Sequence, residues 1–127
     1  MTTIKTLSKE DIIALHKDLI SAYGGTHGVR DEALLDSAVN APFQSFGGVD
    51  FYPSIEEKAA RLGFGLAANH PFHDGNKRIG AHAMLALLLI NGIDLDCSSK
   101  ELSDTFLSIA AGSSDESDLL KWIQEHE

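Results

Sequence analysis

The stretch HPFHDGNKRIGAHAMLALLLING, residues 70–92, joins a short polar loop to a long apolar run. The run from Ile79 to Ile90 contains a single polar side chain, His82, and it ends just before Gly92. A glycine in that place typically ends a helix, and the run is shorter than the roughly 20 residues that a bilayer span needs. We therefore expect a buried helix that begins near Asn76, stops at Gly92 and is apolar on nearly all sides.

Four further helix starts carry the capping-box pattern, in which a Ser side chain and a carboxylate three residues later satisfy free amides at a helix start. The four boxes are SKED from Ser8, SIEE from Ser54, SSKE from Ser98 and SSDE from Ser113. Each is followed by apolar residues at helical spacing. The last of these helices is expected to bury Leu119, Leu120, Trp122 and Ile123.

The helix that starts after Ser8 should end before Gly24 and Gly25, because paired glycines favour a turn. Asp31 is expected to cap a second helix that stops near Pro42. The helix from Ser54 to Asn69 contains Gly63 and Gly65, which lower its helix propensity. We expect these two glycines to allow close helix packing.

The remaining segments add little regular structure. Residues 42–53, PFQSFGGVDFYP, read as a loop, and only IDLDC, residues 93–97, looks briefly extended. The sequence contains no internal repeat, linker or low-complexity segment. It therefore predicts an all-α fold in one domain, residues 1–127, with about six helices around the central apolar helix.

Composition and charge narrow the class of protein. The chain has 127 residues, 43% of them hydrophobic, and a formal net charge of -9. Such an acidic chain is a poor nucleic-acid binder, because binding phosphate backbones needs a basic face. No secretory signal is visible, and the single Cys97 excludes an internal disulfide. We expect a cytoplasmic protein that binds neither a membrane nor nucleic acid directly.

Within this acidic chain, residues 70–91 form a small basic island with Lys77, Arg78 and only one acidic residue, Asp74. A loop that enters a helix presents free N–H groups and the positive end of the helix dipole to an anion. Gly75 permits the tight backbone that such a site requires. Lys77 and Arg78 would repel a bare helix N-terminus but attract a nucleotide polyphosphate. The plain alternative is that both are solvated surface charges.

Two more side chains of the loop suit phosphoryl chemistry. Asp74 could hold Mg²⁺ through one oxygen while phosphates and waters supply the other ligands. His70 could take a proton from an attacking hydroxyl, and Phe72 would anchor the loop in the core. The structural alternatives are that His70 only packs beside the helix and that Asp74 or Asn76 only caps it. His73 and His82 are taken as structural or solvent-facing.

The motif HPFHDGNKR resembles the signature of the Fic/Doc family, His-x-Phe-x-Asp/Glu-Gly-Asn-x-Arg, and in detail the death-on-curing (Doc) branch. Similarity extends to LSKEDIIALHKDLISAYGGTHGVRDEALLDSAV (7–39), YPSIEEKAARLGFGLAANHPF (52–72) and LLLINGIDL (87–95). The resemblance implies a Fic/Doc helical bundle that uses ATP and Mg²⁺. It also implies roles for the motif residues: His70 as general base, Asp74 as Mg²⁺ ligand, Phe72 as buried anchor, Gly75 and Asn76 as the anion-binding turn, and Arg78 at the nucleotide phosphates, beside which the residue argument places Lys77.

The Doc branch implies a toxin that phosphorylates a translation protein, elongation factor Tu, and that a cognate antitoxin neutralises. Family members that transfer AMP usually have Gly where this chain has Lys77 and a second Arg where it has Ala81. Both positions favour phosphoryl transfer. The self-inhibitory pattern of many Fic proteins, Ser/Thr-x-x-x-Glu-Gly/Asn, has no match, since Thr6 and Glu10 are followed by Asp11. A separate antitoxin that folds into an exposed apolar groove is therefore expected.

Three alternative functions stay open at this point. The first is AMP transfer to a protein hydroxyl by the same fold. The second is a metal-dependent HD phosphohydrolase built on His73 and Asp74, with His27 and Asp94 as loose candidates for further ligands. The third is a catalytically silent domain that only binds an antitoxin-like partner.

Overall fold

The computed structural model describes residues 3–127, and six α-helices make up most of this range. A short 3₁₀-helix, η1, and a two-stranded hairpin, β1–β2, lie between the second and third helices. The elements in chain order are α1 (Lys9–Tyr23), α2 (Glu32–Asn40), η1 (Ala41–Phe43), β1 (Ser45–Phe46), β2 (Val49–Asp50), α3 (Ile55–Asn69), α4 (Asn76–Ile90), α5 (Ser99–Ala110) and α6 (Glu116–Glu125). The all-α prediction with six helices is confirmed.

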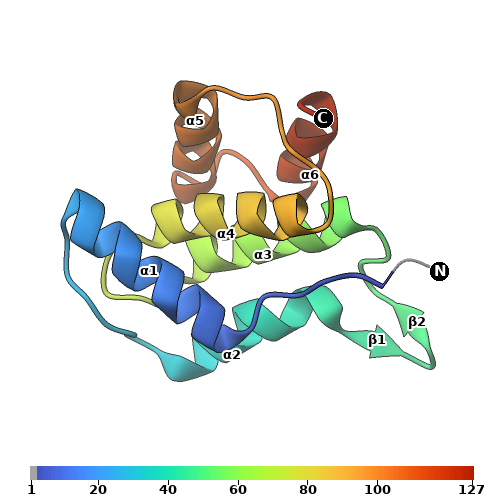
Figure 1. Cartoon of the computed structure of the whole chain (residues 1–127), viewed down its shortest axis with the longest axis horizontal. Coiled ribbons are helices and arrows are strands. Elements are labelled where there is room, and N and C mark those ends of the chain that lie inside the picture. The colour runs from blue at the N-terminus through green and yellow to red at the C-terminus, as the bar shows by residue number, and fades with distance from the viewer. Residues whose placement is uncertain (1–2) are drawn as a thin grey trace.

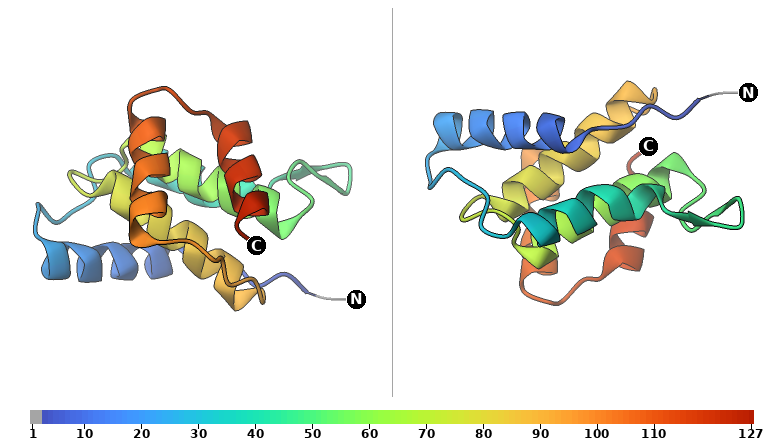
Figure 2. Two further views of the ribbon diagram at one scale, coloured as in Figure 1. Left: turned by 90° about the horizontal axis from the view of Figure 1, so that it is seen from above. Right: turned by 90° about the horizontal axis from the view of Figure 1, so that it is seen from below.

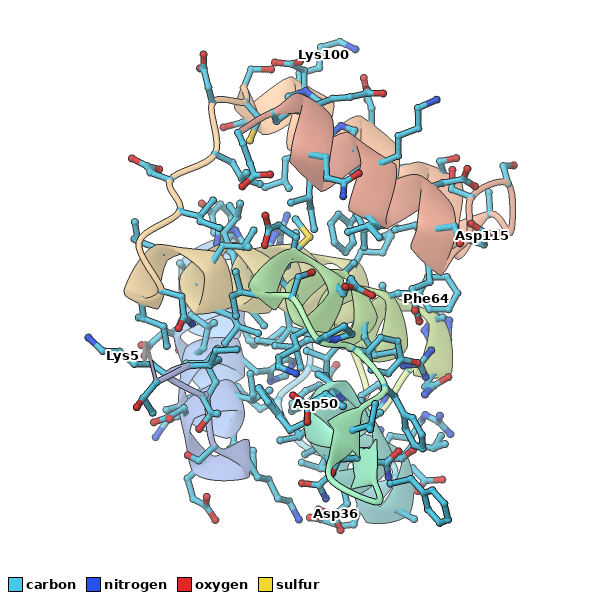
Figure 3. All side chains as sticks on the ribbon, turned by 90° about the vertical axis from the view of Figure 1, so that its right-hand side faces the viewer. Lys5, Asp36, Asp50, Phe64, Lys100 and Asp115 are labelled. Atoms are coloured by element: carbon cyan, nitrogen blue, oxygen red, sulfur yellow. The ribbon has the colours of Figure 1, made fainter. Side chains whose placement is uncertain are left out.

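Helices α3 and α4 lie side by side in the middle of the molecule (Figure 1). Helices α1 and α2 cover one face of this pair, and α5 and α6 cover the opposite face (Figures 1 and 2). Figure 3 shows the same three levels from the side. The helix predicted from the apolar run is therefore central, and its buried apolar residues are Ile79, Ala81, Ala83, Met84, Leu87 and Leu88.

The α3–α4 contact is close because two glycines face each other. A Cβ atom at Gly80 would lie 2.7 Å from the carbonyl oxygen of Gly63, closer than real Cβ contacts come. A Cβ at Gly63 would lie 3.2 Å from the side chain of Phe106, which arrives from α5. The expectation that Gly63 allows close packing is confirmed, and the sequence did not point to Gly80 as its partner.

Side-chain caps start five of the six α-helices of residues 3–127. The predicted boxes at Ser8, Ser54 and Ser98 form, and Asp31 caps α2. The prediction for α6 is wrong by two residues, because its box joins Asp115 and Asp118 rather than Ser113 and Glu116. An aspartate caps a helix as well as a serine does. Ser113 and Asp115 were therefore both possible N-caps for α6.

The predicted loop of residues 42–53 contains unpredicted structure. Pro42 lies in η1, and strands β1 and β2 pair antiparallel through Phe46 and Val49. The buried Lys58 of α3 holds this hairpin, since its Nζ donates to the carbonyl of Tyr52 and to Oδ2 of Asp50, 3.2 Å away. Residues 93–97, the predicted extended stretch, contain no strand.

In the described part of the chain, every helix is too short or too polar to cross a bilayer.

Candidate active site

The signature loop, residues 70–75, connects α3 to α4 at one end of the molecule (Figure 1). His70 ends α3 in the left-handed region, with φ 52° and ψ 55°, and it is the sole non-glycine residue of 3–127 with positive φ. Arg30 supports this conformation: its Nε donates to the His70 carbonyl at 2.8 Å and a terminal nitrogen donates to the Asn69 carbonyl at 3.3 Å. Backbone strain of this kind concentrates at functional positions.

The segment between α1 and α2 pairs with the signature loop. The N–H of His73 donates to the Gly28 carbonyl at 3.1 Å, and the N–H of Arg30 donates to the Pro71 carbonyl at 2.8 Å. Val29 and Phe72 form an isolated antiparallel bridge between the two segments. The loop is therefore fixed along its length by residues more than 40 positions earlier in the chain.

Phe72 and Asn76 fix the loop from inside the core. Phe72 is 1% exposed, and its ring stacks on His16 of α1 with 3.8 Å between centroids. The buried Asn76 side chain accepts a bond from the Phe72 N–H and donates to the Phe72 carbonyl, both at 3.0 Å. The amide of Asn76 is thus used within the loop. Only its backbone can contribute to the anion-binding turn that we expected.

The start of α4 differs from every other α-helix start in residues 3–127. Its N-cap is Gly75, with φ 71°, and no side chain caps its first-turn amides. Its first turn has no acidic residue, whereas the first turns of α1, α2, α3, α5 and α6 all have at least one. Free amides at a helix N-terminus attract anions. This helix end is therefore open to an anion from outside the protein.

Lys77 and Arg78 are exposed in that first turn. Within the range of residues that the structure describes, no ion pair joins either of them to a carboxylate. The guanidinium carbon of Arg78 lies 4.2 Å from the ring centroid of Tyr23, at the end of α1. Stacking on an aromatic face orients the planar guanidinium while its N–H groups stay available. Both positive charges can therefore act on a bound phosphate.

The Asp74 carboxylate is exposed and held in one orientation. Its Oδ1 accepts from the Gly75 N–H at 2.9 Å, and its Oδ2 accepts from the Thr26 N–H at 3.2 Å. Gly25 has φ 117°, which favours glycine, and a Cβ there would come within 2.8 Å of Oδ2 and displace the carboxylate. A fixed, solvent-facing carboxylate with free lone pairs fits a Mg²⁺ ion that keeps most of its waters.

The backbone of Asp74 is held from α1. Nε2 of His16 lies 2.8 Å from the Asp74 carbonyl oxygen, which can only accept, so Nε2 carries the proton and donates. Burial lowers the pKa of His16 below its ordinary value, and this outweighs the opposing effect of the bond to Asp74. The neutral imidazole is therefore the form that makes this contact.

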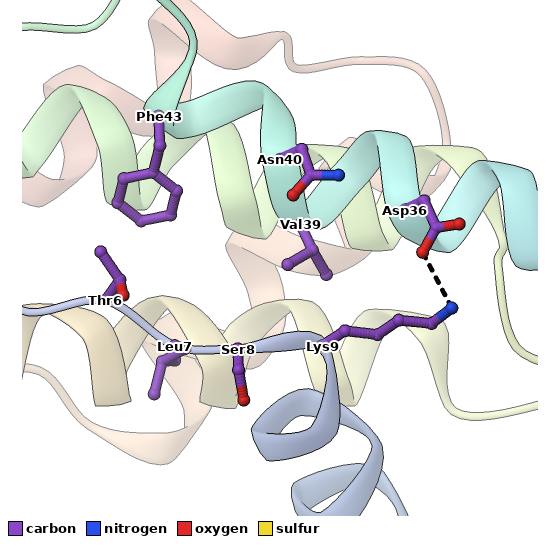
Figure 4. A pocket seen from close by; sticks show the side chains of 8 residues that line it. All are labelled: Thr6, Leu7, Ser8, Lys9, Asp36, Val39, Asn40 and Phe43. Carbon is purple, nitrogen blue, oxygen red and sulfur yellow. Dashed lines mark ion pairs between the residues drawn. The ribbon is translucent and has the colours of Figure 1, made fainter.

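Two hollows open near the N-terminal half of the fold. One of about 290 Å³ lies behind the signature loop and is lined by Ile13, His16, Lys17, His27, Gly28, Val29 and Phe72. The other, of about 380 Å³, lies between the segment that precedes α1 and helix α2 (Figure 4). Lys9 bridges its two walls through an ion pair with Asp36 at 2.8 Å, drawn as the dashed line. Hydrogen bonds to Asp36 and Glu32 raise the pKa of Lys9.

The structure places all the predicted site residues on one loop and the helix turn that follows it. They are His70, Phe72, Asp74, Gly75, Asn76, Lys77 and Arg78. The alternative of a metal-dependent HD phosphohydrolase is less well supported, because Asp94 follows the far end of the 15-residue α4, about 20 Å from Asp74.

Sequence reasoning missed the supporting residues His16, Tyr23, Gly25, Thr26 and Arg30. His16 could have been noticed as a histidine four positions after Ile12 on the apolar face of α1.

Comparison with known proteins gives matches that include this site. The model of the family described as Fic/DOC matches residues 6–88. A protein named toxin Doc from Mycolicibacterium smegmatis is 44% identical over 89 residues, 70% of this chain and 66% of that protein. This chain thus covers just under two thirds of that relative's length. A protein named protein kinase doc from Escherichia phage P1 is 30% identical over 109 residues, 86% of this chain and 85% of that protein.

Proposed function

This chain belongs to the Fic/DOC family, and from that premise we propose that it is a Doc-type toxin that phosphorylates a protein hydroxyl. The donor is ATP with Mg²⁺, and the acceptor is a Ser or Thr of a translation protein, by resemblance elongation factor Tu. A cognate antitoxin neutralises the toxin in the cytoplasm. The names of the two relatives, toxin Doc and protein kinase doc, support this assignment.

The observation that carries the proposal is the open N-terminus of α4. It combines uncapped amides, an N-cap glycine with positive φ and two exposed cations in the first turn. In an isolated helix this arrangement is unfavourable, because Lys77 and Arg78 repel the positive end of the dipole. A polyphosphate bound there turns the repulsion into attraction, and Arg78 can bind two of its oxygens.

The residues of the loop then divide the reaction between them. His70 takes the proton of the Ser or Thr hydroxyl as its oxygen attacks the γ-phosphorus of ATP. The new O–P bond forms, the bond from the γ-phosphorus to the bridging oxygen breaks, and ADP leaves. The amides of the α4 start, with Lys77 and Arg78, hold the phosphates. Mg²⁺ on Asp74 would neutralise phosphate charge during transfer.

Two positions favour phosphoryl transfer over AMP transfer. Lys77 stands where AMP-transferring members usually have Gly, and Ala81 stands where they usually have a second Arg. Ala81 is buried on α4, with 6% of its surface exposed. An arginine could not fit there without moving its neighbours. This packing supports a site with one phosphate-binding arginine.

The experiment that tests the proposal is labelling in a translation extract with Mg²⁺ and ATP, labelled in parallel at the γ- or the α-phosphate. We expect a labelled protein band from the γ-label only, and none with His70→Ala. Label from the α-phosphate would show AMP transfer and overturn our reading of Lys77 and Ala81. No label from either, with no binding of Mg-ATP in solution, would leave the chain as a binding module.

A further inference from the structure

One side of helix α1 contacts the signature loop and the first turn of α4 through three residues at helical spacing. His16 contacts Phe72 and Asp74, Ile20 approaches Gly75, and Tyr23 stacks on Arg78. We propose that His16 is a positioning residue: by holding the Asp74 carbonyl it sets the direction of the Gly75 N–H and of the Asp74 carboxylate. The proposal rests on the function proposed above for this loop.

Peptide planarity connects the His16 hydrogen bond to the site. The Asp74 carbonyl and the Gly75 N–H belong to one planar trans peptide, so they point in opposite directions. Because Nε2 of His16 holds the carbonyl toward α1 at 2.8 Å, the N–H must point away from α1. That N–H donates to Oδ1 of Asp74 at 2.9 Å. One bond in the interior thus fixes a carboxylate on the surface.

The His16 ring gives the loop a second fixed point. It stacks on Phe72 with an angle of 10° between the ring planes. His16 therefore contacts the loop through a side chain at residue 72 and through the main chain at residue 74. With both points held, the turn between them has little freedom to rotate.

Helix α1 packs closely against the turn at Gly75. A Cβ at Gly75 would lie 3.1 Å from Cδ1 of Ile20 and 3.7 Å from Nε2 of His16. His16 is itself 3% exposed, so without the Asp74 carbonyl its buried N–H would lose its partner. The contact therefore stabilises both the histidine and the loop.

Two substitutions separate the donor of His16 from its ring. His16→Gln keeps an N–H donor of similar reach and loses the ring, whereas His16→Phe keeps a ring against Phe72 and loses the donor. His27→Phe is the matched control, because His27 lines the same hollow and its side chain makes no hydrogen bond to the described chain. Hydrogen exchange of the peptide covering residues 72–76 reports on the loop without needing any activity. Transfer kinetics with γ-labelled ATP then give kcat and KM.

We expect the larger increase in exchange at residues 72–76 in His16→Phe, because this variant loses the bond to the Asp74 carbonyl, with unchanged exchange in α3 and α5. In the same variant kcat should fall about 10- to 100-fold while KM for the target protein stays the same, and His16→Gln should recover most of the rate. Wild-type exchange in His16→Phe would overturn the proposal, and so would a His16→Gln variant as slow as His16→Phe. If the wild type transfers no phosphoryl group, the proposed function fails, and the exchange experiment alone decides the role of His16.

Discussion

At the scale of single residues, the most unusual feature is the backbone of His70. A left-handed conformation is unfavourable for a residue with a Cβ by about 1–2 kcal/mol, and glycine is the usual residue where a helix ends in this way. The chain places a histidine there, held by Arg30. The protein therefore accepts a lower stability at this position in order to place the His70 side chain there. Such strain is common at functional positions.

This strain gives a prediction about two variants of His70. His70→Gly should unfold with a free energy about 1 kcal/mol higher than that of His70→Ala, because only glycine is at ease at positive φ. Both variants should lose phosphoryl transfer and growth inhibition. Urea denaturation measures the first effect and the labelling assay the second. A folded His70→Ala protein that still stops growth would remove His70 from the mechanism.

The proposed Mg²⁺-binding role of Asp74 can be tested with a substitution that keeps the shape of the side chain. Asp74→Asn keeps one oxygen to accept from the Gly75 N–H but loses the negative charge that would hold Mg²⁺. We expect transfer to fall about 10- to 100-fold at low Mg²⁺ and to recover in part as Mg²⁺ is raised. The measurement is the rate as a function of Mg²⁺ concentration. Full wild-type rates without any divalent ion would contradict the assigned role.

Arg78 should determine nucleotide affinity. A charge-assisted hydrogen bond contributes about 1.5–3 kcal/mol, so Arg78→Ala should weaken Mg-ATP binding roughly 10- to 100-fold. Lys121→Ala makes the same change in net charge on the exposed side of α6 and should leave binding unchanged. Calorimetric titration of both variants checks the prediction. If Arg78→Ala and Lys121→Ala bound Mg-ATP with equal affinity, Arg78 would be only a solvated surface charge.

At the scale of elements, one glycine of α3 and one of α4 give opposite predictions. A Cβ at Gly65 meets only Ala38 at 3.4 Å, an ordinary contact, whereas a Cβ at Gly80 of α4 would meet the Gly63 carbonyl at 2.7 Å. We expect Gly65→Ala to stabilise the fold by up to about 1 kcal/mol through helix propensity. Gly80→Ala should destabilise it by about 1–3 kcal/mol because α3 and α4 must separate. Thermal and urea unfolding of both variants measure the difference.

The helices could be predicted from the sequence because their signals are local. A Ser or Asp cap followed by an apolar period located the starts of α1, α2, α3 and α5 closely, and the apolar run after the polar loop located the start of α4. The signature loop was found for the same reason, since its chemistry lies in nine consecutive residues.

What the sequence did not reveal depends on contacts between distant segments. The hairpin β1–β2 is held by the buried Lys58, whose partners Asp50 and Tyr52 are visible only once the chain is folded. The role of Arg30 likewise requires the pairing of residues 28–31 with the signature loop, and the role of His16 requires the contact of α1 with that loop. A local pattern can mark such a side chain as buried, as it does for His16, but it cannot identify a partner that is a main-chain carbonyl 40 or more residues away.

At the scale of the whole molecule, His126 makes stability depend on pH. Its Nδ1–H donates to the Trp122 carbonyl and its Nε2 pairs with Glu101 of α5 at 3.1 Å. These contacts, the Trp122 bond first, raise the pKa of His126 above its ordinary 6.5. The folded state therefore binds this proton more tightly than the unfolded chain does.

The stabilisation from His126 is fully present below pH 6.5 and is lost as the pH rises through the folded-state pKa. We expect the free energy of unfolding to fall between pH 6 and pH 8 by more in the wild type than in His126→Gln. Urea denaturation across this range measures it. A wild type and a variant with the same pH profile would show that the contact between α5 and α6 does not depend on this charge.

The position of Phe106 bears on how the chain is made. Synthesis runs from the N-terminus, so α1 and residues 28–31 emerge from the ribosome before the loop that they hold. Phe106, which packs against Gly63 and Gly80, emerges after the whole site is complete. A nonsense mutation between the end of α4 and Phe106 would thus leave residues 70–78 in the chain on a core that is open on one side. Such truncations should inactivate the protein through degradation rather than through lost chemistry.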